Sequence, residues 1–114
     1  MARKAELELT GELFRALGHP LRIKIIDFLR AGERCVCEII PAVGAGQPVV
    51  SKHLSLLRQA GILECRKEGL RVIYRVRDPA VFEVIELSRG FIFRRLAELV
   101  TLAADFQAAQ ERSG

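Results

Sequence analysis

The fold is decided by residues 47–63, which read QPVVSKHLSLLRQAGIL and predict a helix with one buried and one exposed side. Pro48 suits the first helical turn, where a missing N–H costs nothing, and Gly61 is placed to end the helix. The apolar residues recur at helical spacing: Val50, Leu54 and Leu57, with Val49 and Leu56 broadening the stripe.

Polar side chains occupy the other side of this helix. They carry hydrogen-bond donors of the kinds that contact base edges and phosphates: Gln47, Ser51, Lys52, Ser55 and Arg58. His53 lies on the same helix, where it either packs or contacts a phosphate or base. We therefore expect the exposed side of this helix to lie in a DNA groove.

A basic β-hairpin is predicted directly after the helix. Residues 63–67 and 71–76 read as two short strands around a turn at Gly69. Residues 47–77 hold seven basic and two acidic side chains, a net charge of +5, whereas the whole chain carries +4. A helix followed by a basic hairpin is typical of a winged helix-turn-helix, and the focused charge indicates double-stranded DNA as partner. Lys67 and Arg71 of the hairpin are the expected phosphate contacts.

A length of 114 residues with 50% hydrophobic content predicts a single domain over residues 1–114, and the motif above makes it a winged helix-turn-helix. No apolar run approaches the roughly 20 residues of a membrane span, and the first residues lack the apolar core of a signal peptide. We expect a cytoplasmic protein with no membrane partner. The chain has three cysteines, an odd number without an export signal, so free thiols are expected rather than a disulfide framework.

Apolar periodicity predicts helices on both sides of this motif. Residues 5–17 and 21–30 form the first two, and a short helix over 38–43 precedes 47–63, giving a helix-turn-helix unit. A last helix over 79–110 carries more apolar surface than one small domain can hide. The expected fold is mostly α with a small β-hairpin wing, in the order α-α-α-α-β-β-α. We expect a homodimer through residues 5–17 and 79–110.

Two thiols stand two positions apart in Glu33-Arg34-Cys35-Val36-Cys37-Glu38, just before a predicted helix. Side chains at this spacing share one side of an extended segment but not of a helix, so the pair converges only at the helix start. The helix N-terminus and Arg34 favour thiolate over thiol. A disulfide is unfavourable in extended backbone, because the two Cα atoms are then about 6.6 Å apart, near the upper end of the usual range.

Chelation of a soft ion is the better use of such a pair. Thiolates prefer arsenic(III), antimony(III) or another thiophilic metal ion over magnesium or calcium. The alternative interpretation is that Cys35 and Cys37 pack as small apolar side chains.

Three motifs make the chain resemble the ArsR/SmtB family of homodimeric winged-helix repressors that sense metals and metalloids. Residues 14–22 are similar to the family's entry to its second helix, 33–38 to its metal-binding box, and 47–63 to its recognition helix. The resemblance implies a transcriptional repressor, not an enzyme, that leaves its dyad-symmetric operator when ligand binds Cys35 and Cys37. It also implies that these residues face DNA: Gln47, Ser51, Lys52, His53, Ser55 and Arg58.

The chain departs from the family's known metal sites. The position of a third box cysteine holds Ile40, residues 1–34 contain no cysteine, and His19 and His53 are the only histidines. Cys65, on the first hairpin strand, can approach the pair only if no strand lies between them. A closed tetrahedral zinc site is therefore hard to assemble from this sequence.

Two other interpretations remain open at this point. A repressor could sense oxidants or persulfides through the same thiols, because cysteine content alone does not separate this from metalloid sensing. A thiol redox protein or metal carrier is the alternative of another class. That alternative lacks the Cys-x-x-Cys spacing and the βαβ pattern of such enzymes, and it leaves the basic helix unexplained.

Overall fold

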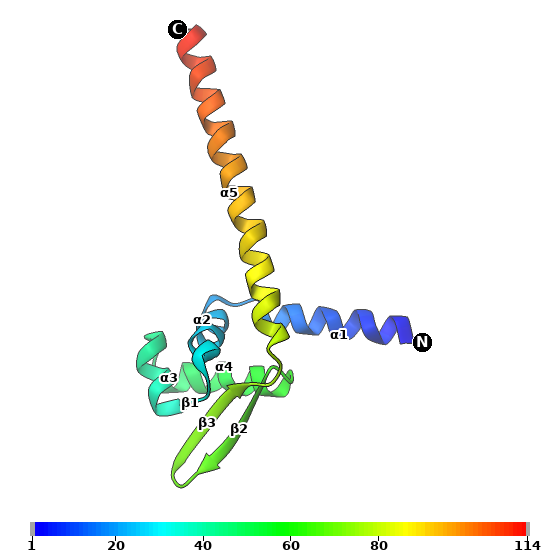
Figure 1. The fold of residues 1–114 in the computed structure, drawn as a ribbon, viewed down its shortest axis with the longest axis vertical. Helices are drawn as coiled ribbons and strands as arrows, with labels where there is room; N and C mark the ends of the chain where they lie inside the picture. The colour runs from blue at the N-terminus through cyan, green and yellow to red at the C-terminus, as the bar shows by residue number, and fades with distance from the viewer. Residues whose placement is uncertain (1, 114) are drawn as a thin grey trace. The chain divides into compact units, whose positions relative to one another are not determined.

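The computed structural model describes residues 2–113 and confirms a mostly helical winged helix-turn-helix (Figure 1). Its elements in chain order are α1 (Ala2–Leu17), α2 (Pro20–Phe28), the 3₁₀ turn η1 (Leu29–Ala31), β1 (Arg34–Cys35), α3 (Val36–Val43), α4 (Gln47–Gln59), β2 (Leu63–Glu68), β3 (Arg71–Val76) and α5 (Ala80–Ser113). The helix predicted over 21–30 thus ends earlier, because its last residues tighten into η1.

The sheet has one strand more than the sequence predicts. Its order is β1-β3-β2, and both pairings are antiparallel. In β1, Arg34 pairs with Tyr74 and Cys35 pairs with Ile73 of β3. A strand of two residues is too short to show the alternation that indicates a strand in a sequence. The added strand ties the cysteine segment to the wing.

Left-handed glycines stand on both sides of α4, one in the turn before it and one after it. Gly44 ends α3 with φ of 69°, and Gly61 follows α4 with φ of 78°, a backbone region that side chains with a Cβ rarely adopt. Between them α4 begins after Gly46 with Pro48 in its first turn. Pro48 and Gly61 therefore begin and end this helix as the sequence predicts.

One side of α4 is buried as predicted. Val50, Leu54 and Leu57 are at most 1% exposed. They join apolar side chains of α2, α3 and β2 that are almost fully buried: Ile25, Ile26, Ile39 and Leu63. Val49, expected to broaden the buried stripe, is instead 48% exposed, because it lies beyond the edge of the side that faces α2 and the sheet.

The chain forms two compact units that meet within α5, between Phe82 and Glu83. The second unit exposes a long series of large apolar side chains: Leu87, Phe91, Ile92, Phe93, Leu96, Leu99, Val100, Leu102 and Phe106. In the first unit, α1 exposes Leu7, Leu9 and Phe14. None of the helices in residues 2–113 combines the length and the apolar character that crossing a bilayer requires.

His53 is a buried residue and not part of the exposed side of α4, which corrects the expected DNA contact. It is 8% exposed, and its Nδ1 accepts a hydrogen bond of 3.0 Å from Nε of Arg22. Its ring lies against His19 of the α2 N-cap, with centroids 4.4 Å apart. The periodic pattern did not show this role, because Arg22 is 31 positions away in the sequence. His53 joins α4 to α2.

We predict that this contact makes the fold sensitive to mild acid. Burial, followed by the charges of His19, Arg22 and Lys52, lowers the pKa of His53 below its usual value. The unfolded chain then binds the proton more readily, so the free energy of unfolding is highest above about pH 7 and falls as the pH drops through about 6.5. Urea titrations between about pH 7.5 and 5.5 measure this loss, and His53→Gln should flatten the profile. An equally steep profile in the variant would contradict the assignment.

Candidate functional site

The exposed side of α4 carries most of the polar residues that the sequence assigns to DNA. Gln47, Ser51, Lys52 and Arg58 are exposed, and Ser55 is half-buried. Gln47 is the first residue of α4 and Ser51 follows one turn later, so both lie at its N-terminal end. The unpaired backbone N–H groups of a helix N-terminus suit an anionic partner. The structure thus groups donor side chains and positive backbone potential at one end of α4.

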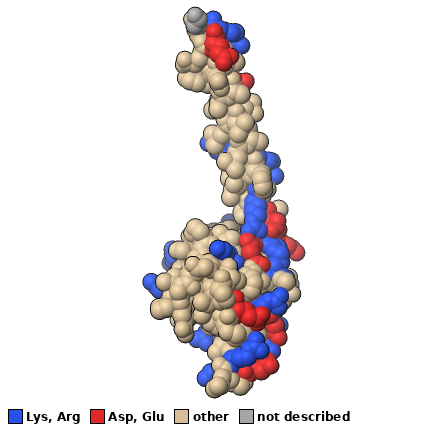
Figure 2. Space-filling view, turned by 90° about the vertical axis from the view of Figure 1, so that its left-hand side faces the viewer, with Lys and Arg blue, Asp and Glu red and all other residues tan. Residues whose placement is uncertain are grey.

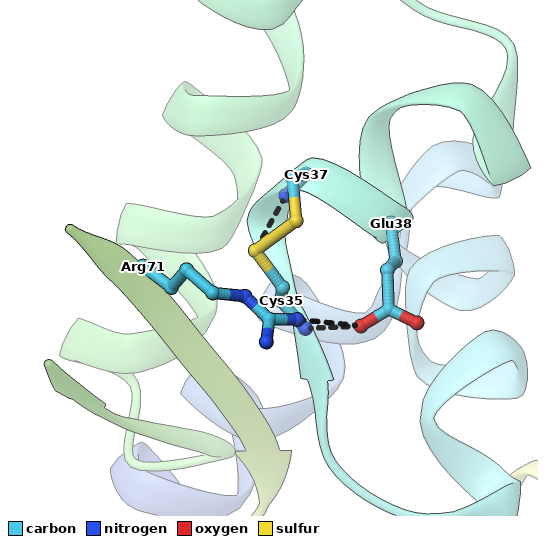
Figure 3. The surroundings of a disulfide bond; sticks show 4 residues. All are labelled: Cys35, Cys37, Glu38 and Arg71. Atoms are coloured by element: carbon cyan, nitrogen blue, oxygen red, sulfur yellow. Dashed lines mark hydrogen bonds and ion pairs between the residues drawn. A yellow bond between two sulfur atoms is a disulfide. The ribbon is translucent and has the colours of Figure 1, made fainter. Parts of the chain in front are cut away.

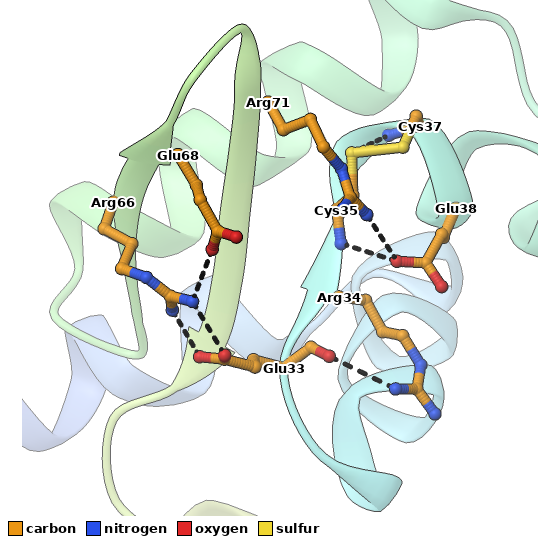
Figure 4. Close-up of polar contacts among 8 residues, drawn as sticks. All are labelled: Glu33, Arg34, Cys35, Cys37, Glu38, Arg66, Glu68 and Arg71. Atoms are coloured by element: carbon orange, nitrogen blue, oxygen red, sulfur yellow. Dashed lines mark hydrogen bonds and ion pairs between the residues drawn. A yellow bond between two sulfur atoms is a disulfide. The ribbon is translucent and has the colours of Figure 1, made fainter.

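Carboxylates of the same unit balance part of the wing's positive charge. Arg66 of β2 donates to Glu33 and to Glu68, each at 2.9 Å (Figure 4). The hydrogen bonding of Arg66 to Glu33, followed by the charges of Arg66 and Arg75, lowers the pKa of Glu33. Arg75 of β3 pairs with Glu64 of β2. Glu64 and Glu68 are already subtracted in the net charge of residues 47–77, whereas Glu33 lies outside that segment and lowers further the charge that the wing presents to a partner.

The two basic wing residues assigned to phosphates differ in their surroundings. Nη2 of Arg71 lies 3.4 Å from Oε1 of Glu38 on α3. Lys67, like Lys52 on α4, forms no ion pair with any residue in 2–113. On the face shown in Figure 2, basic and acidic side chains lie next to one another rather than forming an unbroken basic surface. Lys52 and Lys67 can therefore bind a phosphate without first breaking an ion pair with a carboxylate of the described residues, whereas Arg71 must leave Glu38.

The sulfurs of Cys35 and Cys37 meet at the start of α3, where they form a disulfide (Figure 3). The spacing of extended backbone predicts that this bond is unfavourable. That prediction is wrong because Cys35 is the N-cap of α3 and Cys37 already lies in its first turn. The turn shortens the Cα–Cα distance to 5.1 Å, well inside the range of disulfides.

The two sulfur-bearing residues have different surroundings. Cys35 is 3% exposed, and its Sγ accepts a hydrogen bond of 3.1 Å from the backbone N–H of Cys37. Cys37 is exposed. The backbone N–H of Cys35 donates to Oε1 of Glu38 at 3.1 Å, and this is the same oxygen that faces Arg71. One carboxylate therefore joins the cysteine segment to the wing (Figures 3 and 4).

Cys65 lies apart from the pair. It is in β2, and β3 separates β2 from β1. Two strand spacings, roughly 9 to 10 Å, thus separate its backbone from that of Cys35. Its sulfur is instead 3.6 Å from Nη1 of Arg58. No group of three or more His, Cys, Asp or Glu side chains within residues 2–113 is arranged to hold a metal ion.

A pocket of about 390 Å³ opens between the cysteine pair, α4 and the wing. Both cysteines line it, together with Gln47 and Ser51 of α4. Its remaining wall is formed mainly by Leu54, Leu70, Arg71, Val72 and Tyr74. The sequence could not indicate this pocket, because it depends on the pairing of β1 with β3. The structure therefore brings the candidate ligand pair and part of the candidate DNA surface into one space.

Comparison with known proteins places residues 19–64 in the family described as "Bacterial regulatory protein, arsR family". The chain is 40% identical over 79 residues to the HTH-type transcriptional repressor SmtB of Mycobacterium tuberculosis. It is 42% identical over 81 residues to the HTH-type transcriptional regulator MJ1325 of Methanocaldococcus jannaschii, which is uncharacterised. These matches cover 69% and 70% of this chain, and 58% and 91% of the respective relatives.

The fold is also similar to that of a solved structure, the homodimeric winged helix-turn-helix DNA-binding domain of Mb0332 from Mycobacterium bovis. The TM-score is 0.74 at 31% identity, over 82% of this chain and 87% of that one. Family match, relatives and fold agree with the resemblance found in the sequence. The chain belongs to the arsR family of bacterial regulatory proteins, a family of winged helix-turn-helix transcriptional regulators and not of enzymes.

Proposed function

We propose that this protein is a homodimeric repressor that binds double-stranded operator DNA and releases it when a thiophilic ligand binds Cys35 and Cys37. The observation that carries the proposal is the pocket that joins this cysteine pair to the polar N-terminal end of α4. The pair sits on the first helix of the helix-turn-helix, so a change at the thiols acts next to the helix that reads DNA.

Contacts to DNA divide into two kinds in this proposal. Gln47 and Ser51 carry side-chain donors and acceptors suited to base edges, so they contribute to sequence discrimination. Lys52, Ser55, Arg58, Lys67 and Arg71 supply cations and hydroxyls for the phosphates. His53 is excluded from this surface by its burial.

We predict that wing and α4 variants change different quantities, the overall DNA affinity in one case and the preference for operator in the other. Lys67→Ala should weaken binding to operator and random duplex alike and reduce the salt dependence by about one released counterion. Ser51→Ala should mainly reduce the preference for operator, by about 1 to 3 kcal/mol per lost base contact. Fluorescence anisotropy over a salt series measures both effects.

The matched control is Arg112→Ala, which removes the same charge from α5. It should leave DNA affinity and the salt slope unchanged. A salt-insensitive wild-type protein, or one that binds no duplex, would overturn the DNA-binding proposal.

Dimerisation is proposed through residues 5–17 and 79–110. Both segments expose large apolar side chains, and patches of this kind normally mark an interface. The Mb0332 domain named above is a homodimer, which supports the same assembly here. Two copies of α4 related by a two-fold axis would match an operator with dyad symmetry.

Substitution of Leu99 tests this interface. Leu99→Glu places a charge on an apolar side chain that is 43% exposed, so we expect monomers at micromolar concentration and loss of tight operator binding. Sedimentation equilibrium measures the first and anisotropy the second. Thr101→Glu is the control and should leave the dimer intact, because Thr101 lies on the opposite side of the same helix from Leu99, among Arg94 and Glu98. A well-folded Leu99→Glu monomer that still binds one operator tightly would contradict the interface.

The ligand is proposed to be arsenite, antimonite or another soft metal ion, bound after reduction of the disulfide. Two thiolates on one protomer fit a soft ion, and the N-terminal end of α3 favours their charged form. The described residues do not fit a closed tetrahedral zinc site, because no group of three or more His, Cys, Asp or Glu side chains among them is arranged to hold a metal ion. Cys65 is not proposed as a ligand, since β3 lies between it and Cys35.

The disulfide favours a second candidate function, a repressor that senses oxidants or persulfides through the same pair. Cys35 and Cys37 are bonded in this structure, so the fold holds their sulfurs close enough for the bond to form by thiol oxidation. In that case the signal is the redox state of the pair and not a bound ion. The two candidates share every residue and differ only in the stimulus.

Serine variants separate these candidates. We predict that Cys35→Ser and Cys37→Ser each still bind operator but no longer release it with arsenite, whereas Cys65→Ser responds like wild type. The expected loss of affinity on ligation is about 1 to 3 kcal/mol. DNA binding of the reduced proteins is measured with arsenite, zinc and peroxide added separately. If peroxide alone releases the operator from the wild-type protein, redox sensing is favoured. If arsenite releases the operator from both Cys35→Ser and Cys37→Ser, the thiol assignment is overturned.

A further inference from the structure

We propose that the pocket beside Cys35 and Cys37 holds the organic substituent of a trivalent organoarsenical, and that this ligand and DNA exclude each other from the pocket. The inference rests on the proposed DNA-binding function and names the ligand class and the mode of release. Four features of the described residues lead to it: the valence of the ligand, the wall of the pocket, the chemistry of exchange and the position of α4.

Valence favours a ligand that brings its own third bond. Trivalent arsenic forms three bonds, and Cys35 and Cys37 supply two sulfurs. The Cα atoms of these two residues are 5.1 Å apart, so both sulfurs can bind the same arsenic atom. No third cysteine lies within reach, because β3 separates Cys65 from the pair. No other group of His, Asp or Glu within residues 2–113 completes a three-ligand cluster. An arsenical with one carbon substituent needs only the two thiolates.

The pocket wall favours an apolar substituent. Leu54, almost fully buried, and Tyr74, 8% exposed, contribute apolar surface beside the cysteines. Leu70 and Val72 continue this surface along the wing. A phenyl ring is well inside a volume of about 390 Å³ and would cover apolar surface that water now meets. The described pocket therefore fits an aryl group better than the hydroxyl of inorganic arsenite.

The exchange chemistry balances without a further oxidant. A phosphine first reduces the disulfide to two thiols and leaves as the phosphine oxide, with its oxygen taken from water. Each thiol then replaces one hydroxyl on the arsenic of the hydrated arsenical. Two As–O bonds break, two As–S bonds form, two waters leave, and arsenic stays trivalent. The resulting dithioarsonite, with its As–C bond intact, joins Cys35 to Cys37.

The position of α4 makes ligand and DNA competitors. Gln47 and Ser51, the residues proposed to read bases, line the same pocket as the two cysteines. Arg71, proposed to contact phosphate, stands at the wing side of it. A substituent in this space occupies the volume that DNA approaches. Release then needs no relay through the fold, because one partner simply keeps the other out.

Competition is tested with phenylarsine oxide as the probe on the phosphine-reduced full chain and a duplex selected by the protein from random sequences. The apparent dissociation constant for DNA should rise in proportion to free arsenical with no plateau. Stopped-flow dissociation of a preformed complex should proceed at the same rate with or without the probe, because the arsenical enters only after DNA has left. A plateau with a ternary complex, or faster dissociation, would overturn mutual exclusion and indicate release through a conformational change.

The seat of the substituent, meaning its proposed binding position in the pocket beside Cys35 and Cys37, is tested by calorimetry on the protein without DNA. Val72→Phe narrows the pocket and should weaken phenylarsine oxide about tenfold while affecting a methyl arsenical less. Val76→Phe is the matched control on the same strand, outside this pocket, and should change neither affinity. Equal affinities in wild type and Val72→Phe, or equal losses in both variants, would overturn the seat.

A third variant covers the case in which Val72→Phe does not fold. Leu70→Ala removes a fully exposed side chain from the pocket wall and should reduce the preference for phenyl over methyl. An unchanged preference would count against the seat. A chain that binds no duplex would remove the proposed function and mutual exclusion together, whereas the arsenical affinities measured without DNA would still decide the seat.

Discussion

One-sided burial of α4 is the constraint on which the rest of the structure depends. Val50, Leu54 and Leu57 are sealed against α2 and the sheet, so the helix cannot rotate without exposing them. Removing such a side chain typically costs about 2 to 5 kcal/mol, a large share of the stability of a small domain. Arg22 of α2 further fixes the rotation of α4 by donating a hydrogen bond to the buried ring of His53. Gln47 and Ser51 are therefore exposed because of what the opposite side of the helix buries.

Cys35 belongs to two structural elements at once. Cys35 occupies the N-cap of α3, a place more often held by Ser, Thr, Asp or Asn, and its sulfur accepts the N–H that such a residue would satisfy. Its backbone belongs at once to β1, where Cys35 pairs with Ile73. The helix cap and the sheet edge together hold this sulfur beside the N-terminal end of α4 and the wing, in the pocket that they share.

Apolar periodicity and boundary residues such as Pro48 and Gly61 were enough to predict the helices, the hairpin and the ends of α4, since these features depend on neighbours along the chain. The features that were missed depend on distant partners. β1 exists only because β3 pairs with it, and the burial of His53 depends on Arg22. The disulfide was not predicted because the Cα spacing of extended backbone does not hold for Cys37, which already lies in α3. The pocket joining the thiols to α4 follows from the same unpredicted strand.

Two ion pairs connect the cysteine segment to the wing, Glu33 with Arg66 and Glu38 with Arg71, and each spans 33 positions. They reduce the charge that the wing shows to DNA. All four side chains remain substantially exposed, so these pairs add little to stability and a phosphate can replace a carboxylate at small cost. Glu38 also accepts from the backbone of Cys35, so its position depends on the start of α3. The thiol segment thus bears on how freely Arg71 meets a phosphate, even before a ligand occupies the space beside it.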